Sequence, residues 1–287
     1  MKKLFHGACT ALVTPFRDGY INYCMLDRLL ELQLEAGIDA MVICGTTGES
    51  ATLTDEEKLA LYRHTANRVG GACQLIAGTG GNCTKKAAEL TRAACDTGVD
   101  AVLSVTPYYN KCTQDGLLRH YTEIAEASSL PVILYNVPSR TTVSIEVATC
   151  AKLAEHPNIQ GIKEADPNAV KVLKLREACG EEFRIYCGND DCTLSFYASG
   201  ADGVISVYSN LYPNQTKKLT DFCEQGAYKK AAALLCTCLP LMDALFCVPN
   251  PMPVKAALQM MGIDVGNCRL PLTEPSQAQK AMLKALL

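Results

Sequence analysis

The chain has 287 residues, of which 48% are hydrophobic and 20% charged, so it can bury one large core and is not expected to be disordered. Its net charge of -3 and its lack of a basic run argue against nucleic acid or an anionic membrane as a partner and favour a small-molecule substrate. No apolar segment approaches the ~20 residues of a membrane helix, because Pro240 and Asp243 interrupt the longest apolar stretch.

The N-terminus and the cysteines bear on where the protein works. Residues 1–5 imitate the start of a signal peptide, but His6, Pro15 and Arg17 interrupt any apolar stretch. The sixteen cysteines include no Cys-x-x-Cys pair. We therefore expect a cytoplasmic protein whose cysteines remain reduced and mostly serve as small apolar residues.

Eight apolar runs have the length of a buried β-strand, and helical patterns separate them. The runs lie near residues 8–13, 39–44, 74–78, 100–105, 131–135, 159–163, 184–188 and 203–207. This alternation predicts an α/β protein built as a closed parallel (β/α)8 TIM barrel, with a doubly wound open sheet as the weaker alternative.

Local signals mark the ends of several helices. The expected features are a capping box at residues 54–57, a helix from Thr84 to Gly98, one from Ser144 to about His156, and one capped by Asp166 with Pro167 at its first position. A glycine, an Asp-containing turn and an apolar strand also recur at residues 37–42, 98–103 and 200–206. The recurrence indicates a repeated αβ unit.

The last part of the chain differs from the repeated units. Residues 210–287 are mostly helical in periodicity, are punctuated by prolines, and are too few for a second core. We therefore expect the barrel to occupy residues 1–209. Residues 210–287 would form a helical extension packed on the barrel or on a neighbouring subunit.

Lys163 ends the sixth predicted strand, on the side of a parallel barrel where the chemistry is found. A lysine amine attacks a carbonyl only in its neutral form, which requires a poorly hydrated pocket. Pairing with a carboxylate, or reaching outward from the rim, is the commoner role of a single lysine. Lys163 is therefore a candidate nucleophile that needs further support.

Other strand ends converge on the same rim. The turn Gly45-Thr46-Thr47-Gly48 can offer N–H and hydroxyl groups to a carboxylate, although an ordinary turn has the same composition. Tyr135 ends the strand next to Lys163, about 5 Å away at backbone level, where a phenol could carry protons. A buried core tyrosine is the equally common alternative.

Other chemistries fit less well. His64, His120 and His156 fall in predicted helices and His6 lies near the terminus, so no zinc cluster is expected. Asp190 and Asp191 place negative charge where such barrels usually bind phosphate. The glycine-rich residues 78–82 lack the Gly-Lys-Ser/Thr ending of a P-loop.

Five motifs, in order and over nearly the whole chain, resemble the dihydrodipicolinate synthase family. They are Gly45-Thr46-Thr47-Gly48-Glu49, Pro107-Tyr108-Tyr109-Asn110, Tyr135-Asn136-Val137-Pro138-Ser139-Arg140-Thr141, Gly161-Ile162-Lys163-Glu164 and Asn250-Pro251-Met252-Pro253-Val254-Lys255. The resemblance implies a lyase of the class I aldolase type in lysine and diaminopimelate biosynthesis. Such an enzyme joins pyruvate to L-aspartate 4-semialdehyde through a Schiff base, with neither a metal nor an organic cofactor.

The resemblance also implies roles for particular residues. Lys163 would form the Schiff base, while Thr46, Tyr135 and Tyr109 from a neighbouring subunit would relay protons. Thr47 would hold the pyruvate carboxylate, and Arg140 would bind the carboxylate of the aldehyde. Gly188 and Ile205 match positions whose backbone carbonyls line the pocket. Family members are usually homotetramers, arranged as a dimer of dimers.

Arg140 bears on the second substrate. Lyases acting on sialic acid share the fold, the lysine and the tyrosine but as a rule lack this arginine motif. Arg140 therefore favours the small acidic aldehyde over a sugar. The alternative activity is that of a related pyruvate aldolase or lyase acting on a sugar acid, such as N-acetylneuraminate or a 2-keto-3-deoxy acid. A non-catalytic barrel that senses a keto acid is a further alternative.

Several positions depart from the family pattern. Cys112 stands where proline is frequent, and Asn189 replaces an aspartate present in many members. Asp55, Lys58 and Lys86 stand where members inhibited by lysine commonly carry two histidines and a glutamate. A cationic Lys86 should repel the ammonium groups of an effector lysine, so weak or absent feedback inhibition by L-lysine is expected.

Overall fold

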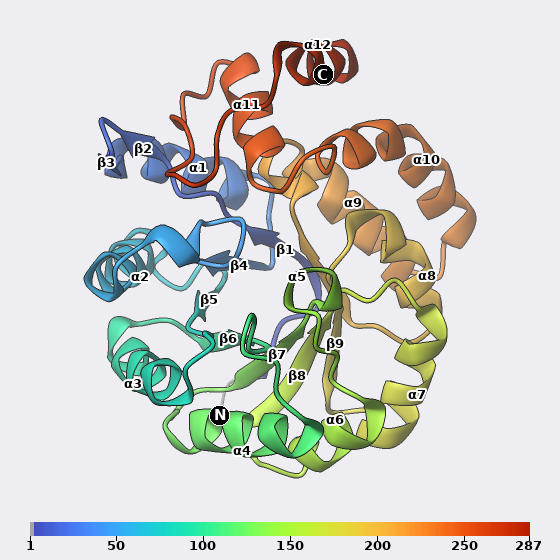
Figure 1. The fold of residues 1–287 in the computed structure, drawn as a ribbon. Helices are drawn as coiled ribbons and strands as arrows, with labels where there is room; N and C mark the ends of the chain where they lie inside the picture. The colour runs from blue at the N-terminus through green and yellow to red at the C-terminus, as the bar shows by residue number, and fades with distance from the viewer. Residues whose placement is uncertain (1–2) are drawn as a thin grey trace.

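The computed structural model describes residues 3–287 and shows a closed barrel of eight parallel strands surrounded by helices (Figure 1). The strands, in their order around the barrel, are β1 (Gly7–Ala11), β4 (Ala40–Ile43), β5 (Gln74–Gly78), β6 (Ala101–Val105), β7 (Val132–Asn136), β8 (Ile159–Glu164), β9 (Arg184–Cys187) and β10 (Gly203–Ser206). Strand β1 pairs with both β4 and β10, which closes the barrel. The predicted (β/α)8 fold is confirmed, and the open sheet is excluded.

A helix follows each barrel strand. These helices are α1 (Tyr23–Glu35), α2 (Asp55–Val69), α3 (Thr84–Ala94), α4 (Gln114–Glu126), α6 (Val147–Ala154), α7 (Ala169–Cys179), α8 (Thr193–Ala198) and α9 (Pro213–Glu224). Smaller elements decorate the loops: the antiparallel ribbon of β2 (Phe16–Arg17) and β3 (Tyr20–Ile21), the short helix α5 (Pro138–Thr141), and 3₁₀ turns at Ser50–Thr52, Cys95–Thr97, Asp190–Cys192 and Tyr208–Asn210. Among residues 3–287, no helix is long and apolar enough to cross a membrane.

Three further helices complete the chain: α10 (Tyr228–Ala244), α11 (Met252–Met260) and α12 (Gln277–Leu286). They lie outside the ring of barrel helices, beyond α1 and α9 in Figure 1. Helix α9 packs against β1, β10 and α8, so it occupies the place of the eighth barrel helix. The expected division at residue 209 falls before α9, and we propose instead that the extension begins with α10.

The helix starts follow the predicted signals in part. Thr54 and Glu57 form the predicted capping box at the start of α2, and α3 begins at Thr84. Two expected caps are wrong. Helix α6 begins three residues after Ser144, whose hydroxyl accepts a hydrogen bond from Lys171, and α7 is capped by Asn168 rather than Asp166. Asn168 accepts from the N–H groups of the first turn, which satisfies donors that Asp166 lies too early in the chain to reach.

The repeated glycine and aspartate turns lie at the N-terminal end of the barrel. Asp39, Asp100 and Asp202 each accept a hydrogen bond from the N–H group of a neighbouring strand, at Ala8, Leu75 and Ile185 respectively, over 2.8, 2.9 and 2.8 Å. Each carboxylate thereby satisfies a backbone donor at this end of the sheet. The repeated αβ unit is confirmed, and its aspartates help to fix the strand register.

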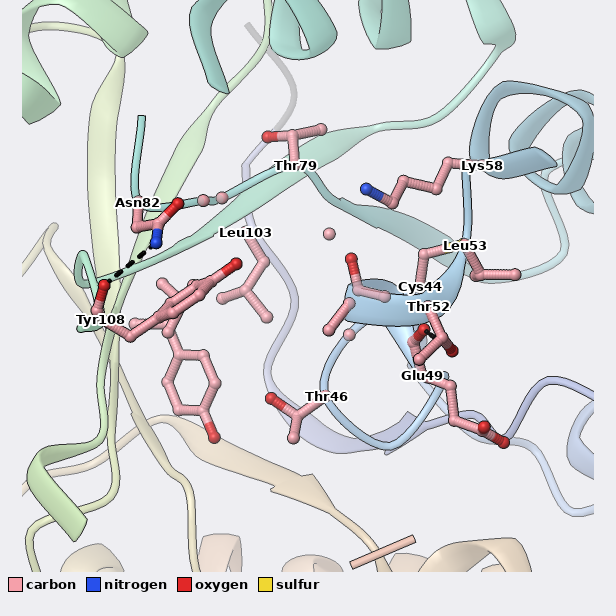
Figure 2. A pocket seen from close by; sticks show the side chains of 18 of the residues that line it. Cys44, Thr46, Glu49, Thr52, Leu53, Lys58, Thr79, Asn82, Leu103 and Tyr108 are labelled. Atoms are coloured by element: carbon pink, nitrogen blue, oxygen red, sulfur yellow. Dashed lines mark hydrogen bonds between the residues drawn. The ribbon is translucent and has the colours of Figure 1, made fainter. Parts of the chain in front are cut away.

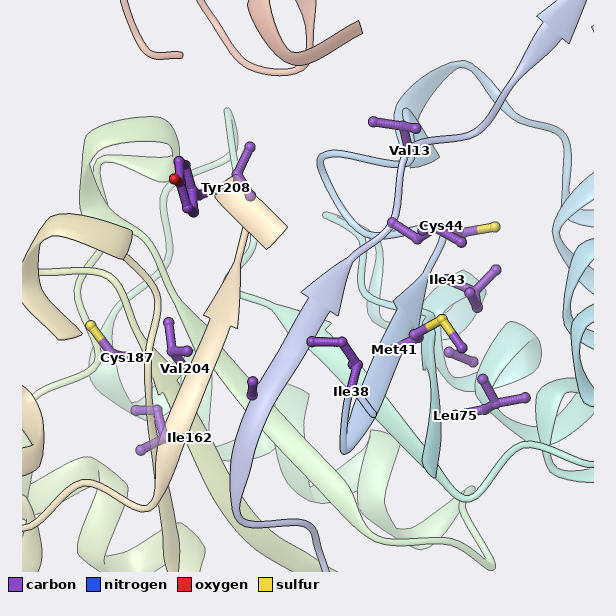
Figure 3. Close-up of a cluster of buried hydrophobic side chains, with 14 of the residues drawn as sticks. Val13, Ile38, Met41, Ile43, Cys44, Leu75, Ile162, Cys187, Val204 and Tyr208 are labelled. Atoms are coloured by element: carbon purple, nitrogen blue, oxygen red, sulfur yellow. The ribbon is translucent and has the colours of Figure 1, made fainter. Parts of the chain in front are cut away.

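Two apolar layers form the core. The outer layer lies between strands and helices, where Figure 3 shows Met41, Ile43 and Leu75 on the side of the strands that faces away from the barrel axis. The inner layer contains several small side chains, including Cys9, Ala11, Ala40 and Ala101. These small residues leave room inside the barrel for larger side chains from β7, β8 and β9.

The N-terminal segment closes one end of the barrel. The ring of Phe5 stacks on that of Tyr186, with centroids 4.2 Å apart. The Tyr186 hydroxyl donates a hydrogen bond to the Phe5 carbonyl over 2.8 Å. Because this end is filled, the open end lies at the carboxyl ends of the strands, where the candidate site is found.

Candidate active site

Lys163 and Tyr135 lie side by side inside the barrel. Strands β7 and β8 pair with Tyr135 opposite Lys163, as predicted. The Lys163 amine lies 4.5 Å from the centre of the Tyr135 ring, and the two residues are only 5% and 7% exposed. Among residues 3–287, Lys163 forms no ion pair, so the common role of a lysine as the partner of a carboxylate is not what its geometry shows.

The neighbouring carboxylate, Glu164, points to the other side of strand β8 and has partners of its own. It lies 2.9 Å from the Lys171 amine and accepts hydrogen bonds from the Asn136 side chain and the Asp166 N–H. Burial raises the pKa of Glu164, and the positive charge of Lys171 opposes that change. Lys171 thus neutralises the charge of Glu164 outside the barrel interior. The Glu164 carboxylate is therefore not the partner of the Lys163 amine.

A cavity of about 540 Å³ opens at the carboxyl ends of the strands (Figure 2). Thr46, Tyr135 and Arg140 line it, so the structure brings these three predicted residues together. Figure 2 shows Lys58 and Tyr108 entering it from opposite sides, with Thr46 on the loop that follows Cys44. Lys163 is not among the residues that line the cavity, but its amine lies against the ring of Tyr135, which does line it.

The other predicted residues lie around this cavity rather than on its wall. Thr47 is buried behind Thr46, and Ile205 lies in the inner core together with Tyr135. Gly188 directly follows β9, and its N–H donates to the Glu164 carbonyl. Tyr109 is 93% exposed and does not reach the cavity of its own chain.

Asn250 joins the two residues expected to bind carboxylates. Its side-chain amide donates to the Thr47 hydroxyl over 2.9 Å, and its carbonyl accepts from the Arg140 guanidinium over 3.3 Å. Asn250 is buried and lines the cavity. The sequence marked Asn250 only as the first residue of a motif, and the contact with Thr47 is invisible in the sequence because the residues are 203 positions apart.

A buried ion pair anchors the C-terminal segment to the loop after β4. The Lys255 amine lies 2.8 Å from the Glu49 carboxylate and donates to the carbonyls of Thr14 and Asn267. The second Glu49 oxygen accepts from the Arg269 N–H. Glu49 and Lys255 are 3% and 2% exposed, so both charges depend on these partners. Sequence reasoning missed this pair, although both residues belong to the quoted motifs.

Arg269 strengthens the same attachment. Its guanidinium donates to both carboxylate oxygens of Glu57 and to the Thr52 carbonyl, and it lies over the ring of Phe16. Hydrogen bonds from Arg269 hold the pKa of Glu57 below its usual value. The turn that carries Thr46 and Thr47 is therefore fixed on its outer side by the C-terminal segment.

The geometry at the end of β4 also explains a glycine requirement. Cys44 adopts a left-handed conformation, with φ 55°, and its carbonyl faces Gly78 of β5. A Cβ at position 78 would lie 2.2 Å from that carbonyl oxygen. Glycine at 78 thus permits the close approach that turns the chain from Cys44 into the Thr46 loop.

Metal binding is not evident in the described part of the chain. Residues 3–287 contain no group of three or more His, Cys, Asp or Glu side chains placed to hold a metal ion. His64 and His120 lie in α2 and α4 as predicted, whereas His156 lies just beyond the end of α6. Burial lowers the pKa of His120 to about 4, which makes it a neutral core residue at neutral pH.

Comparisons with known proteins agree over the whole chain. The model of the dihydrodipicolinate synthetase family matches residues 4–287. A 4-hydroxy-tetrahydrodipicolinate synthase from Alkaliphilus oremlandii is 45% identical over 280 residues, which cover 98% of this chain and 97% of the relative. The solved 4-hydroxy-tetrahydrodipicolinate synthase of Methylacidiphilum fumariolicum SolV is 44% identical, with a TM-score of 0.97 and coverage of 99% and 95%. A lysine-bound structure from Cyanidioschyzon merolae is 39% identical, with a TM-score of 0.96 and coverage of 99% and 98%.

The buried ion pair gives a prediction about stability. Lys255→Met should lower the free energy of unfolding by about 3–5 kcal/mol, because it leaves the Glu49 carboxylate buried without its counter-charge. Adding Glu49→Gln should recover part of this loss, since the uncompensated charge is then removed. Urea unfolding of the single and double variants measures both effects.

A matched control uses an exposed pair. Lys85 lies 4.0 Å from Glu89, and the two side chains are 83% and 56% exposed. Lys85→Met should change stability by less than about 1 kcal/mol. If the stability losses of Lys255→Met and Glu49→Gln simply added in the double variant, the predicted energetic coupling between the two residues would be contradicted.

Proposed function

Because the chain belongs to the dihydrodipicolinate synthetase family, we propose that it condenses pyruvate with L-aspartate 4-semialdehyde to form 4-hydroxy-tetrahydrodipicolinate. The enzyme is then a lyase of the class I aldolase type, acting at the first committed step of lysine and diaminopimelate biosynthesis. The observation that carries the proposal is the buried Lys163 amine against Tyr135, which lines a cavity together with Thr46 and Arg140. The names of the relatives do not favour the sugar-acid alternative.

Lys163 acts as the nucleophile in this proposal. Its neutral amine attacks the ketone carbon of pyruvate, and loss of water leaves an imine. The imine withdraws electrons, so the pyruvate methyl group loses a proton and an enamine forms. The enamine carbon then attacks the aldehyde of the second substrate. Burial of Lys163 supports this role, because among residues 3–287 no carboxylate forms an ion pair with the amine.

Three hydroxyl groups move protons in the proposed mechanism. Thr46 and Tyr135 come from the loop after β4 and the end of β7, and both line the cavity. Tyr109 is assigned to the cavity of a neighbouring subunit. Its 93% exposure and its distance from its own cavity support donation to another chain. The relay supplies the proton needed when water leaves and accepts the proton lost by the methyl group.

The substrate carboxylates have separate proposed sites. Thr47 binds the pyruvate carboxylate, and the exposed guanidinium of Arg140 binds that of the aldehyde. The contacts of Asn250 with both residues support a fixed spacing between the two sites. The backbone carbonyls of Gly188 and Ile205 complete the proposed lining. No metal or organic cofactor enters this mechanism.

The assembly and location follow from the same proposal. If each subunit receives Tyr109 from a neighbour, the active assembly must contain at least two subunits. We propose the homotetramer that is usual in this family. A cytoplasmic location remains a prediction of the sequence.

Lys163→Ala tests the proposed nucleophile. Turnover of pyruvate and L-aspartate 4-semialdehyde should fall at least about 1,000-fold, because the variant lacks the amine that forms the imine. The measurement couples the product to an added dihydrodipicolinate reductase and follows the loss of NADPH absorbance. The exposed Lys174→Ala on α7 is the control and should keep full activity. Undiminished turnover in Lys163→Ala would refute the mechanism.

Arg140→Ala tests the second substrate. The KM for L-aspartate 4-semialdehyde should rise about 10- to 100-fold, since a charge-assisted contact is worth roughly 1.5–3 kcal/mol, whereas the KM for pyruvate should change little. Arg119→Ala, an exposed change on α4, is the control. Equal losses for both substrates would contradict the assignment of Arg140.

Weak or absent inhibition by L-lysine remains a prediction. Asp55, Lys58 and Lys86 line the same cavity, and Lys58 pairs with Asp55 over 3.2 Å. The Cyanidioschyzon merolae relative was solved with lysine bound. In this chain Lys86 adds a second positive charge beside Lys58, which should repel the ammonium groups of L-lysine. Activity should persist at millimolar L-lysine, and Lys86→Glu should increase sensitivity. Clear inhibition of the unchanged protein at sub-millimolar L-lysine would refute the prediction.

A further inference from the structure

Two cysteines meet between helices α6 and α7, away from the proposed active site. Cys150 lies in α6 and Cys179 is the last residue of α7, and their sulfur atoms are 3.9 Å apart. Cys150 is fully buried, whereas Cys179 is partly exposed. A pair of thiols at this distance needs only a local movement to become covalently linked.

Cys179 is accessible through a cavity of about 350 Å³ on the surface near the N-terminal end of the barrel. Lys3, His156 and Arg184 also line this cavity, together with the single acidic residue Glu182. A small oxidant can therefore reach Cys179 without any opening of the core. Cys150 is fully buried and does not line this cavity.

The two thiols differ in acidity. The hydrogen bond with Cys150 and the positive charge of Arg176 lower the pKa of Cys179, although burial opposes them. The same hydrogen bond and burial raise the pKa of Cys150 well above its usual value. The accessible cysteine is thus the more reactive one, because the thiolate is the nucleophile.

We propose that Cys179 and Cys150 form a reversible redox site that hydroperoxides oxidise to an intramolecular disulfide. The Cys179 thiolate attacks one oxygen of hydrogen peroxide, which breaks the O–O bond and gives a sulfenic acid and hydroxide. The Cys150 sulfur then attacks the sulfenic sulfur and displaces its hydroxyl group. The displaced group and the Cys150 proton leave as water. Overall, two thiols are oxidised, one peroxide is reduced and two waters form.

The end of α7 can accommodate this bond. A disulfide needs an S–S distance of about 2.05 Å, so the sulfurs must approach each other by about 2 Å. Cys179 is followed by Gly180, which has φ 80° and ends the helix, so the last residue of α7 can move without disturbing a continuing helix. The bond would tie together the helices that follow the strands of Tyr135 and Lys163.

Peptide mapping tests the proposal directly on the whole protein. After treatment with hydrogen peroxide and alkylation of the remaining thiols, trypsin should release peptide 141–152 linked to peptide 177–184. Each of these peptides contains a single cysteine, at 150 and 179. The linked pair should be lighter by two hydrogen atoms than the sum of the two reduced peptides, and dithiothreitol should separate it into those peptides.

Variants separate the two steps. Cys150→Ser, whose hydroxyl can still form a hydrogen bond with the Cys179 sulfur, should stop the reaction at the sulfenic acid and increase dimedone labelling of Cys179 several-fold. Cys179→Ser should abolish both the label and the link. The exposed Cys24, Cys83, Cys236 and Cys247 serve as internal controls. Oxidation of these residues while Cys150 and Cys179 remain alkylatable, or linkage of Cys179 to a different cysteine, would overturn the proposal.

Discussion

The burial of one amine beside one phenol is the constraint around which the rest of this structure is arranged. A parallel barrel holds neighbouring strands in fixed register, so Tyr135 and Lys163 necessarily meet once β7 and β8 pair. Among residues 3–287 the Lys163 amine has no ion-pair partner, and burying an amine in this way costs stability. A lysine with a purely structural role would not need to be placed at that cost. The inner layer of small side chains makes space for this pair, and the stacked Phe5 and Tyr186 close the barrel on the other side.

The polar residues above the amine depend on contacts far apart in the sequence. Asn250 links Thr47 to Arg140, and the buried Glu49–Lys255 pair holds the C-terminal segment against the loop that carries Thr47. The C-terminal segment therefore serves the site as well as the core, because Asn250 lies in the connection between α10 and α11 and Lys255 lies in α11. Relative to an apolar pair, buried charges are not a clear source of stability. Their use here is consistent with fixing the position of a loop.

The sequence predicted the strands well because their apolar runs are short, distinct and bounded by turn signals. The pairing of Tyr135 with Lys163 was also predictable, since register follows once both residues end adjacent strands. The start of α7 was not, because Asn168 and Asp166 are both good caps and the choice between them depends on local geometry. The Glu49–Lys255 pair could not be predicted from one sequence, since 206 positions separate its members.

Covalent trapping of pyruvate is the measurement that tests the central claim most directly. The protein would be incubated with pyruvate, reduced with borohydride and digested with trypsin. We predict that the adduct lies on Lys163, so that cleavage at this residue is lost and peptide 153–171 appears with the added mass of reduced pyruvate. An adduct on another lysine, or no adduct in a protein that still turns over pyruvate, would contradict the account.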